Sequence, residues 1–203
     1  LETMGNMALG FVLGLTFMFA IQYANYFYSR LAIGKAYRLL AKEWDGVFKA
    51  GSFFKPPTVF FDHKGTRAEL SSFYLYRGKT GNYTQLRFSL DKAYLQAFIV
   101  TTNEDGYSVD SVRPELANSL MEAAWSEELA NIDSLSNAQG IELRFDGDTF
   151  IVRKRGLLIE EKNLTVFKNA CVSLLDNLFA GLGEAIGKPR VLPECQHLPI
   201  HQG

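Results

Sequence analysis

The spacing of hydrophobic residues changes along the chain. It begins with a continuous apolar run, without the alternation of a strand or the single stripe of an amphipathic helix. Residues 7–28 contain no Asp, Glu, Lys, Arg or Pro. At ~1.5 Å per residue, a helix over this run is about 33 Å long, which matches a hydrocarbon core of ~30 Å. The run therefore predicts a transmembrane helix after a short flank at residues 1–6. A cleaved secretory signal fits less well, because the flank lacks Lys and Arg and no A-x-A pattern follows.

Residues 29–57 are expected to form a juxtamembrane amphipathic helix and a Pro-containing linker. Apolar residues recur there at spacings of four and three, as a heptad-like seam of Ile33, Tyr37, Leu40, Trp44 and Val47. This seam is too short for an independent coiled coil. It is expected to pack either on the domain of this protein or on a partner helix. Gly51 and Pro56-Pro57 are expected to end the segment.

Residues 58–187 are predicted to form a globular domain, because the apolar period there switches first to two and later back to helical spacing. Segments rich in aromatic and β-branched residues predict strands at 58–62, 69–77, 84–90, 96–102, 141–145 and 149–159. Helices are predicted after Ser111, after Ser126 and after Asn163, the last with a wide apolar face. The sequence thus predicts an α+β fold with helices packed on one face of a mostly antiparallel sheet.

Residues 188–203 are expected to form a Pro-rich extended tail. Its apolar side chains could dock the tail on a surface, and they are Val191, Leu192, Leu198 and Ile200. The tail also holds Cys195, His197 and His201, residue types that bind zinc or a haem iron. Pro199 stands between the two histidines and no second ligand pair follows, so we expect neither a metal nor a cofactor.

Composition and motifs argue against nucleic-acid binding and give no catalytic signature. The chain has 21 Lys and Arg against 22 Asp and Glu, so its net charge gives no reason to expect nucleic acid. No G-x-S-x-G, H-E-x-x-H or P-loop pattern is present in the sequence. His63 beside Asp62 is interpreted as an exposed turn residue, and Cys171 as a buried hydrophobic residue. We therefore expect no enzymatic activity.

Charges flanking the apolar run predict its orientation. Basic residues dominate residues 29–50, where Glu43 and Asp45 are the acidic ones, whereas residues 1–6 hold only Glu2. The basic residues are Arg30, Lys35, Arg38, Lys42 and Lys49. By the positive-inside rule, the N-terminus lies outside and the domain is cytoplasmic, in the cell membrane or, in a bacterium, the inner membrane. Sparse cysteine usage agrees with a reducing compartment.

Small and amide residues within the apolar run suggest helix packing. Gly10 and Gly14 form a G-x-x-x-G pair, and Gln22 and Asn25 could hydrogen-bond a neighbouring helix, although the G-x-x-x-G pair is also common by chance.

Our hypothesis is a single-pass accessory, scaffold or assembly subunit of a respiratory, photosynthetic, transport or secretion complex, in contact with other membrane subunits and the bilayer. The alternative is a membrane-tethered enzyme or ligand-binding domain whose site is assembled from residues far apart in the sequence, and in which the Cys and His residues of the tail could bind a metal.

Overall fold

The structure is a computed structural model that describes residues 2–52, 55–75, 81–91, 97–103, 106–111, 125–136, 138 and 140–182. Its helices are α1 (Glu2–Glu43), α3 (Trp125–Asp133) and α4 (Glu161–Leu182). Its strands are β1 (Val47–Lys49), β2 (Thr58–His63), β3 (Thr66–Leu75), β4 (Gly81–Ser89), β5 (Phe98–Asn103), β6 (Gly106–Ser111), β7 (Ile141–Phe145) and β8 (Thr149–Arg155). The predicted α+β class is therefore confirmed.

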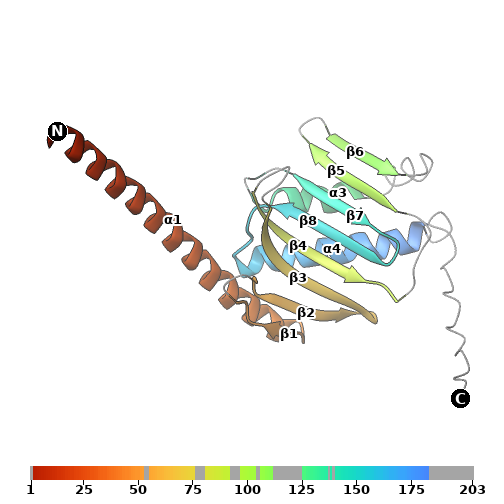
Figure 1. The fold of residues 1–203 in the computed structure, drawn as a ribbon. Helices are drawn as coiled ribbons and strands as arrows, with labels where there is room; N and C mark the ends of the chain where they lie inside the picture. The colour runs from red at the N-terminus through yellow and green to blue at the C-terminus, as the bar shows by residue number, and fades with distance from the viewer. Residues whose placement is uncertain are drawn as a thin grey trace, which may run out of the picture.

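The strands form one eight-stranded antiparallel sheet in the order β1-β2-β3-β4-β8-β7-β5-β6 (Figure 1). Residues opposite one another across a ladder project to the same face. The register pairs Leu70 with Leu86, Leu86 with Val152 and Val152 with Leu143, so one apolar row crosses the middle of the sheet. This row is fully or almost fully buried and forms the centre of the core.

The helices cover the face of the sheet that carries this apolar row. Helix α4 lies along it, and its buried residues recur at spacings of three and four, as Leu164, Phe167, Cys171, Leu174 and Leu178. The opposite face carries polar pairs: Arg153 donates to Gln85 at 2.8 Å and to Glu142 at 2.6 Å. One apolar and one polar face are typical of an antiparallel sheet that packs helices on one side.

The C-terminal part of α1 belongs to this core. Tyr37 and Leu40 are fully buried, and Ile33 is nearly so. The Tyr37 hydroxyl lies 2.7 Å from Ser72 Oγ on β3, which satisfies a polar group that burial would otherwise penalise. The predicted seam thus meets the sheet of this same domain at these positions.

Beyond the helix end, Trp44 continues this packing against α4 and β2. Its ring meets Phe61 edge-on, with the ring centroids 5.2 Å apart. The Lys168 ammonium of α4 lies 4.9 Å from the Trp44 ring centroid and 5.6 Å from that of Phe61. An ammonium over aromatic faces is attracted by the ring quadrupole, so this contact helps to join α1, α4 and β2.

Helix α1 ends earlier than the sequence predicts, and Val47 lies outside it. Asp45 adopts a left-handed conformation with φ 50°, and the Gly46 amide donates to the Ala41 carbonyl at 2.7 Å, as in a Schellman cap. A Cβ on Gly46 would lie 2.5 Å from the Phe60 carbonyl oxygen, so this close approach requires glycine. Val47 then enters edge strand β1 with 68% of its surface exposed and does not extend the buried seam.

The N-terminal part of α1 projects away from the domain (Figure 1). Its described side chains are exposed, including the large apolar residues Phe11, Val12, Leu13, Leu15, Phe17, Met18, Phe19 and Ile21. Among the residues that the structure describes, no helix is long and apolar enough to cross a membrane. A transmembrane helix at residues 7–28 is therefore unsupported by the structure and stays a prediction.

Two strands were absent from the sequence prediction. Strand β1 occupies a segment expected to be helical, and β6 pairs with β5 where Ser111 was expected to cap a helix. Both are edge strands: β1 is only three residues long, and β6 (GYSVDS) contains Gly and Asp, which are depleted in strands. Most of the helix predicted after Ser111 lies outside the described residues, as does the tail at 188–203.

Lys154 is a charged residue within the core. Its side chain is fully buried on β8, and its ammonium donates to Asp133 Oδ1 at 2.7 Å and to the Ala138 carbonyl at 2.6 Å. Asp133 is the last residue of α3, so this pair joins the end of α3 to the middle of the sheet. The Asp133 side chain is 41% exposed, so Lys154 is the buried partner, and removing Asp133 would leave the buried ammonium uncompensated.

Asp133→Asn should destabilise the domain by about 3 kcal/mol, because it leaves the buried Lys154 ammonium without its anion. Asp146→Asn is the matched control, since it breaks the half-exposed pair of Asp146 with Arg144 and should cost less than about 1 kcal/mol. Chemical denaturation of the full chain in detergent measures both effects. Equal loss of stability in the two variants would show that the Lys154 pair is no more important than a surface pair.

Candidate functional site

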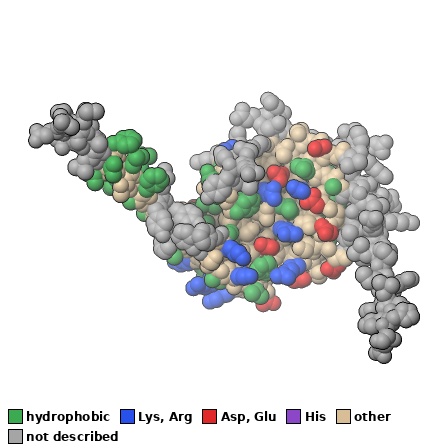
Figure 2. All heavy atoms as spheres, in the orientation of Figure 1, with side chains coloured by type: hydrophobic (Ala, Val, Ile, Leu, Met, Phe, Trp, Pro, Cys, Tyr) green, Lys and Arg blue, Asp and Glu red, His purple; other side chains and the backbone are tan. Residues whose placement is uncertain are grey.

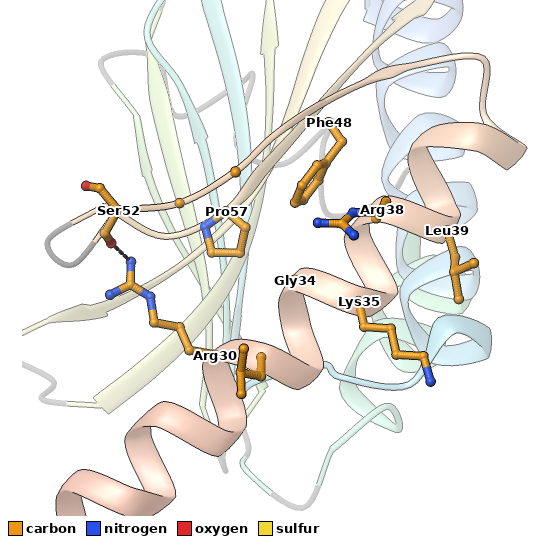
Figure 3. Close-up of a pocket in the computed structure, with 11 residues that line it drawn as sticks. Arg30, Gly34, Lys35, Arg38, Leu39, Phe48, Ser52 and Pro57 are labelled. Atoms are coloured by element: carbon orange, nitrogen blue, oxygen red, sulfur yellow. Dashed lines mark hydrogen bonds between the residues drawn. The ribbon is translucent and has the colours of Figure 1, made fainter.

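A groove of about 550 Å³ lies where α1 enters the domain, between the helix and β1 (Figure 3). One wall is formed by α1, from which Arg30, Gly34 and Arg38 face the groove. Residues four apart lie on one helix face, so these three follow one another along the wall. The opposite wall consists of Phe48 on β1 and Pro57 just before β2.

Gly34 adds no side chain to the α1 wall of the groove. Among the described residues, nothing lies within 4 Å of a Cβ placed on Gly34. Glycine costs roughly 1 kcal/mol relative to alanine within a helix, so a helical glycine beside a hollow keeps space at the expense of helix stability. A side chain at this position of α1 would therefore project into open space.

Arg30 holds the far wall in place. Its guanidinium donates to the backbone carbonyls of Ser52 and Lys55, which also exchange backbone hydrogen bonds of 2.8 and 3.1 Å with each other (Figure 3 shows the Ser52 contact). At the other end of the groove, the Arg38 guanidinium lies 5.3 Å from the Phe48 ring centroid. The cation–π contact thus connects α1 to β1, and the charge-assisted hydrogen bonds connect it to the segment that follows β1.

The groove is basic. Of the described residues that line it, Arg30, Lys35 and Arg38 are charged, and none is acidic. Figure 2 shows Lys and Arg side chains gathered over the region where α1 joins the domain, while acidic side chains are more frequent over the opposite side. The positive charges favour anions, and the apolar lining residues Leu31 and Leu39 on α1 and Phe48 on β1 favour an amphipathic ligand.

A second, smaller hollow of about 240 Å³ lies beside the first and shares Arg30 and Pro57 with it. Its other lining residues include Ser29 and Ile33 on α1, and Tyr74 on β3. Together the two hollows flank α1 at the point where it leaves the core. This junction is the region of the described structure in which we place the candidate site.

A separate ionic cluster connects the β2–β3 turn to α4. Asp176 accepts hydrogen bonds from His63 at 3.2 Å and from Lys64 at 2.8 Å. Burial opposes ionisation of Asp176, but the hydrogen bonds and charges of Lys64 and His63 outweigh burial and lower its pKa. His63 is therefore engaged with α4, and the cluster serves to attach the turn to the helix.

The structure places the other predicted site residues as follows. Gly10, Gly14, Gln22 and Asn25 lie on the projecting part of α1. Cys171 is fully buried in α4, and burial raises the pKa of its thiol. The tail residues Val191, Leu192, Cys195, His197, Leu198, Ile200 and His201 lie outside the described residues. In the part that the structure describes, no group of three or more His, Cys, Asp or Glu could hold a metal.

The sequence does not predict the groove, because one wall comes from a segment with helical periodicity and the other from a short strand and the residues that follow it. The sequence prediction treats Arg30 and Arg38 only as part of the charge asymmetry, although their spacing of eight places them on one helix face. The Asp45-Gly46 pair is a turn signal that would have ended the helix and started β1. Contact between Arg30 and residues 52 and 55 has no local sequence signal.

Comparison with known proteins gives a fold-level similarity. The chain matches no protein family model and no curated protein sequence. Its structure is similar to the crystal structure of the mycobacterial trehalose monomycolate transport factor A, TtfA, with a TM-score of 0.53 and 9% sequence identity. The similarity covers 79% of this chain and 98% of that one. At this identity it shows a shared fold.

Arg30→Gln should loosen the far wall of the groove. Losing the charged donor removes two charge-assisted hydrogen bonds, so the amides of Ser52 and Lys55 should exchange with deuterium roughly tenfold faster. Lys35→Gln is the control, because it removes an equal charge nearby and should leave exchange at both amides unchanged. Unaltered exchange in Arg30→Gln would mean that the segment is held by other contacts.

Proposed function

We propose that this protein is a non-catalytic, membrane-anchored accessory subunit of a larger membrane transport assembly. In this proposal, residues 7–28 of α1 cross the membrane and the α+β domain is positioned at its cytoplasmic surface. The observation that carries the proposal is the division of α1 into a projecting apolar part and a part that is buried in the domain core.

The exposed apolar side chains on the projecting part of α1 support the proposal that this part lies in an apolar environment. Phe11, Phe17 and Phe19 each expose 67% or more of their surface. Contiguous exposed apolar surface on a folded protein marks a site of contact with a membrane or another protein. Because these side chains lie around the helix and not along a single stripe, lipid on all sides fits better than one docked partner.

The orientation follows from the charges at the junction. Five basic residues follow the apolar segment, while the six residues before it carry one acidic and no basic residue, which favours a cytoplasmic domain. The tyrosines and Phe27 between residues 23 and 28 would lie at the headgroup level on the same side.

An accessory role in transport is supported by two features. A solved structure that shares this fold is a transport factor by name. Within the apolar segment, Gly10 and Gly14 offer a small-residue face on which another transmembrane helix could pack closely. In the described part of the chain, nothing lies within 4 Å of a Cβ on Gly14, so that face is open for a partner.

Anchoring can be tested with the Leu15→Lys, Phe19→Lys double variant. A lysine near the centre of a transmembrane helix costs about 3 kcal/mol, so two should move much of the full-length protein into the alkaline carbonate supernatant of host membranes. The matched control is Tyr107→Lys, Val166→Lys, which places two lysines at exposed apolar positions of the domain. Equal extraction of wild type and both variants would contradict membrane anchoring by α1.

The accessory role can be tested with Gly14→Leu. Leucine fits beside the open Gly14 within this chain but blocks close approach of a second helix, so co-purifying membrane proteins should be lost while carbonate resistance is kept. Thr16→Leu places the same leucine side chain on the opposite side of α1 and is the control. Quantitative mass spectrometry of native membrane extracts measures partner recovery. Full recovery with Gly14→Leu would contradict this packing face.

A further inference from the structure

We propose that the groove between α1 and β1 binds the phosphate headgroup of an anionic phospholipid from the membrane that holds α1. This inference rests on the proposed function, because it requires the membrane surface to lie beside the junction. The phosphate would lie near Arg38 and Lys35, and the glycerol and first part of an acyl chain near Leu31 and Phe48.

The charge of the groove selects an anion. Arg38 faces the groove from α1, and Lys35 projects from the adjoining side of the helix at the rim (Figure 3). Guanidinium and ammonium groups are the usual protein partners of phosphate oxygens. Arg30 already bonds the Ser52 and Lys55 carbonyls, so we assign it to shaping the site and not to the ligand.

The position of the groove along α1 selects a membrane lipid. Arg30 follows the predicted apolar segment by two residues, and Arg38 lies about 12 Å farther along the helix at ~1.5 Å per residue. The headgroup layer extends about 5–8 Å beyond the hydrocarbon core on each side. The groove would therefore begin within this layer at Arg30 and reach beyond it at Lys35 and Arg38, about 10 and 15 Å past the end of the apolar segment. A bound headgroup would be drawn out of the layer toward these basic residues, since basic residues next to a transmembrane helix attract anionic lipids.

The shape of the groove selects an amphipathic ligand. A volume of about 550 Å³ lies within the ~300–1,000 Å³ that is typical of small-molecule sites. Leu31, Phe48 and Pro57 line the same groove as Arg38 and Lys35, and Gly34 adds no side chain to it. A free inorganic anion would leave these apolar surfaces uncovered, whereas a glycerophospholipid covers both parts.

Native mass spectrometry of the full chain in detergent micelles tests this proposal, with phosphatidylglycerol and phosphatidylcholine titrated separately. Wild type should bind phosphatidylglycerol at least about tenfold more tightly, and each charge removed by Lys35→Gln or Arg38→Gln should weaken its binding about fivefold. Gly34→Leu should abolish the preference by filling the hollow, while leucine favours the helix and preserves the fold. Arg87→Gln, Lys162→Gln removes two charges elsewhere and should leave the preference intact.

Three outcomes would overturn the proposal: equal binding of both lipids, a preference that survives the groove variants, or full displacement of phosphatidylglycerol by millimolar inorganic phosphate. Carbonate resistance of each variant is measured in parallel. Retained anchoring without lipid preference contradicts only the groove proposal. A lipid preference in a protein that carbonate extracts contradicts the proposed anchoring and leaves the groove as an anionic lipid site reached from solution.

Discussion

The burial of the C-terminal part of α1 in the core of the domain is the contact on which the rest of the structure depends. Tyr37 and Leu40 are fully buried, and the Tyr37 hydroxyl pairs with Ser72 in the middle of the sheet. Because α1 is one continuous helix, fixing this end also fixes the direction of the projecting apolar end. In the proposed membrane setting, the domain would therefore be held at a defined orientation to the bilayer and not tethered by a loose linker.

The same docking creates the groove. Edge strand β1 lies next to β2 only because the helix ends at Glu43 and the chain turns back through Asp45 and Gly46. Arg30 then attaches the following segment to the helix, and Gly34 leaves the space between them open. The basic rim consequently lies at the point where the helix leaves the core. Anchoring and lipid recognition, as proposed, would thus share one structural origin.

Strong periodicity in the sequence was enough to predict the class of fold but not the site. The α4 stripe and the alternating residues of β2 to β4 each bury one face, so their patterns are visible locally. By contrast, β1 is three residues long and Val47 looks like a helix residue by spacing alone. The hydrogen bonds from Arg30 to residues 52 and 55, and the pair of buried Lys154 with Asp133, join segments that are distant in sequence, and only the folded chain brings them together.

The central claim is that one continuous helix is buried in the domain at one end and in the membrane at the other. Single-cysteine variants Thr3→Cys, Phe17→Cys and Leu39→Cys, made in a Cys195→Ser background, test it with a membrane-impermeant thiol reagent applied to spheroplasts. The account predicts labelling at position 3 in intact spheroplasts, at position 39 only after permeabilisation, and at position 17 in neither case. Labelling at position 17, or at position 39 in intact spheroplasts, would contradict it.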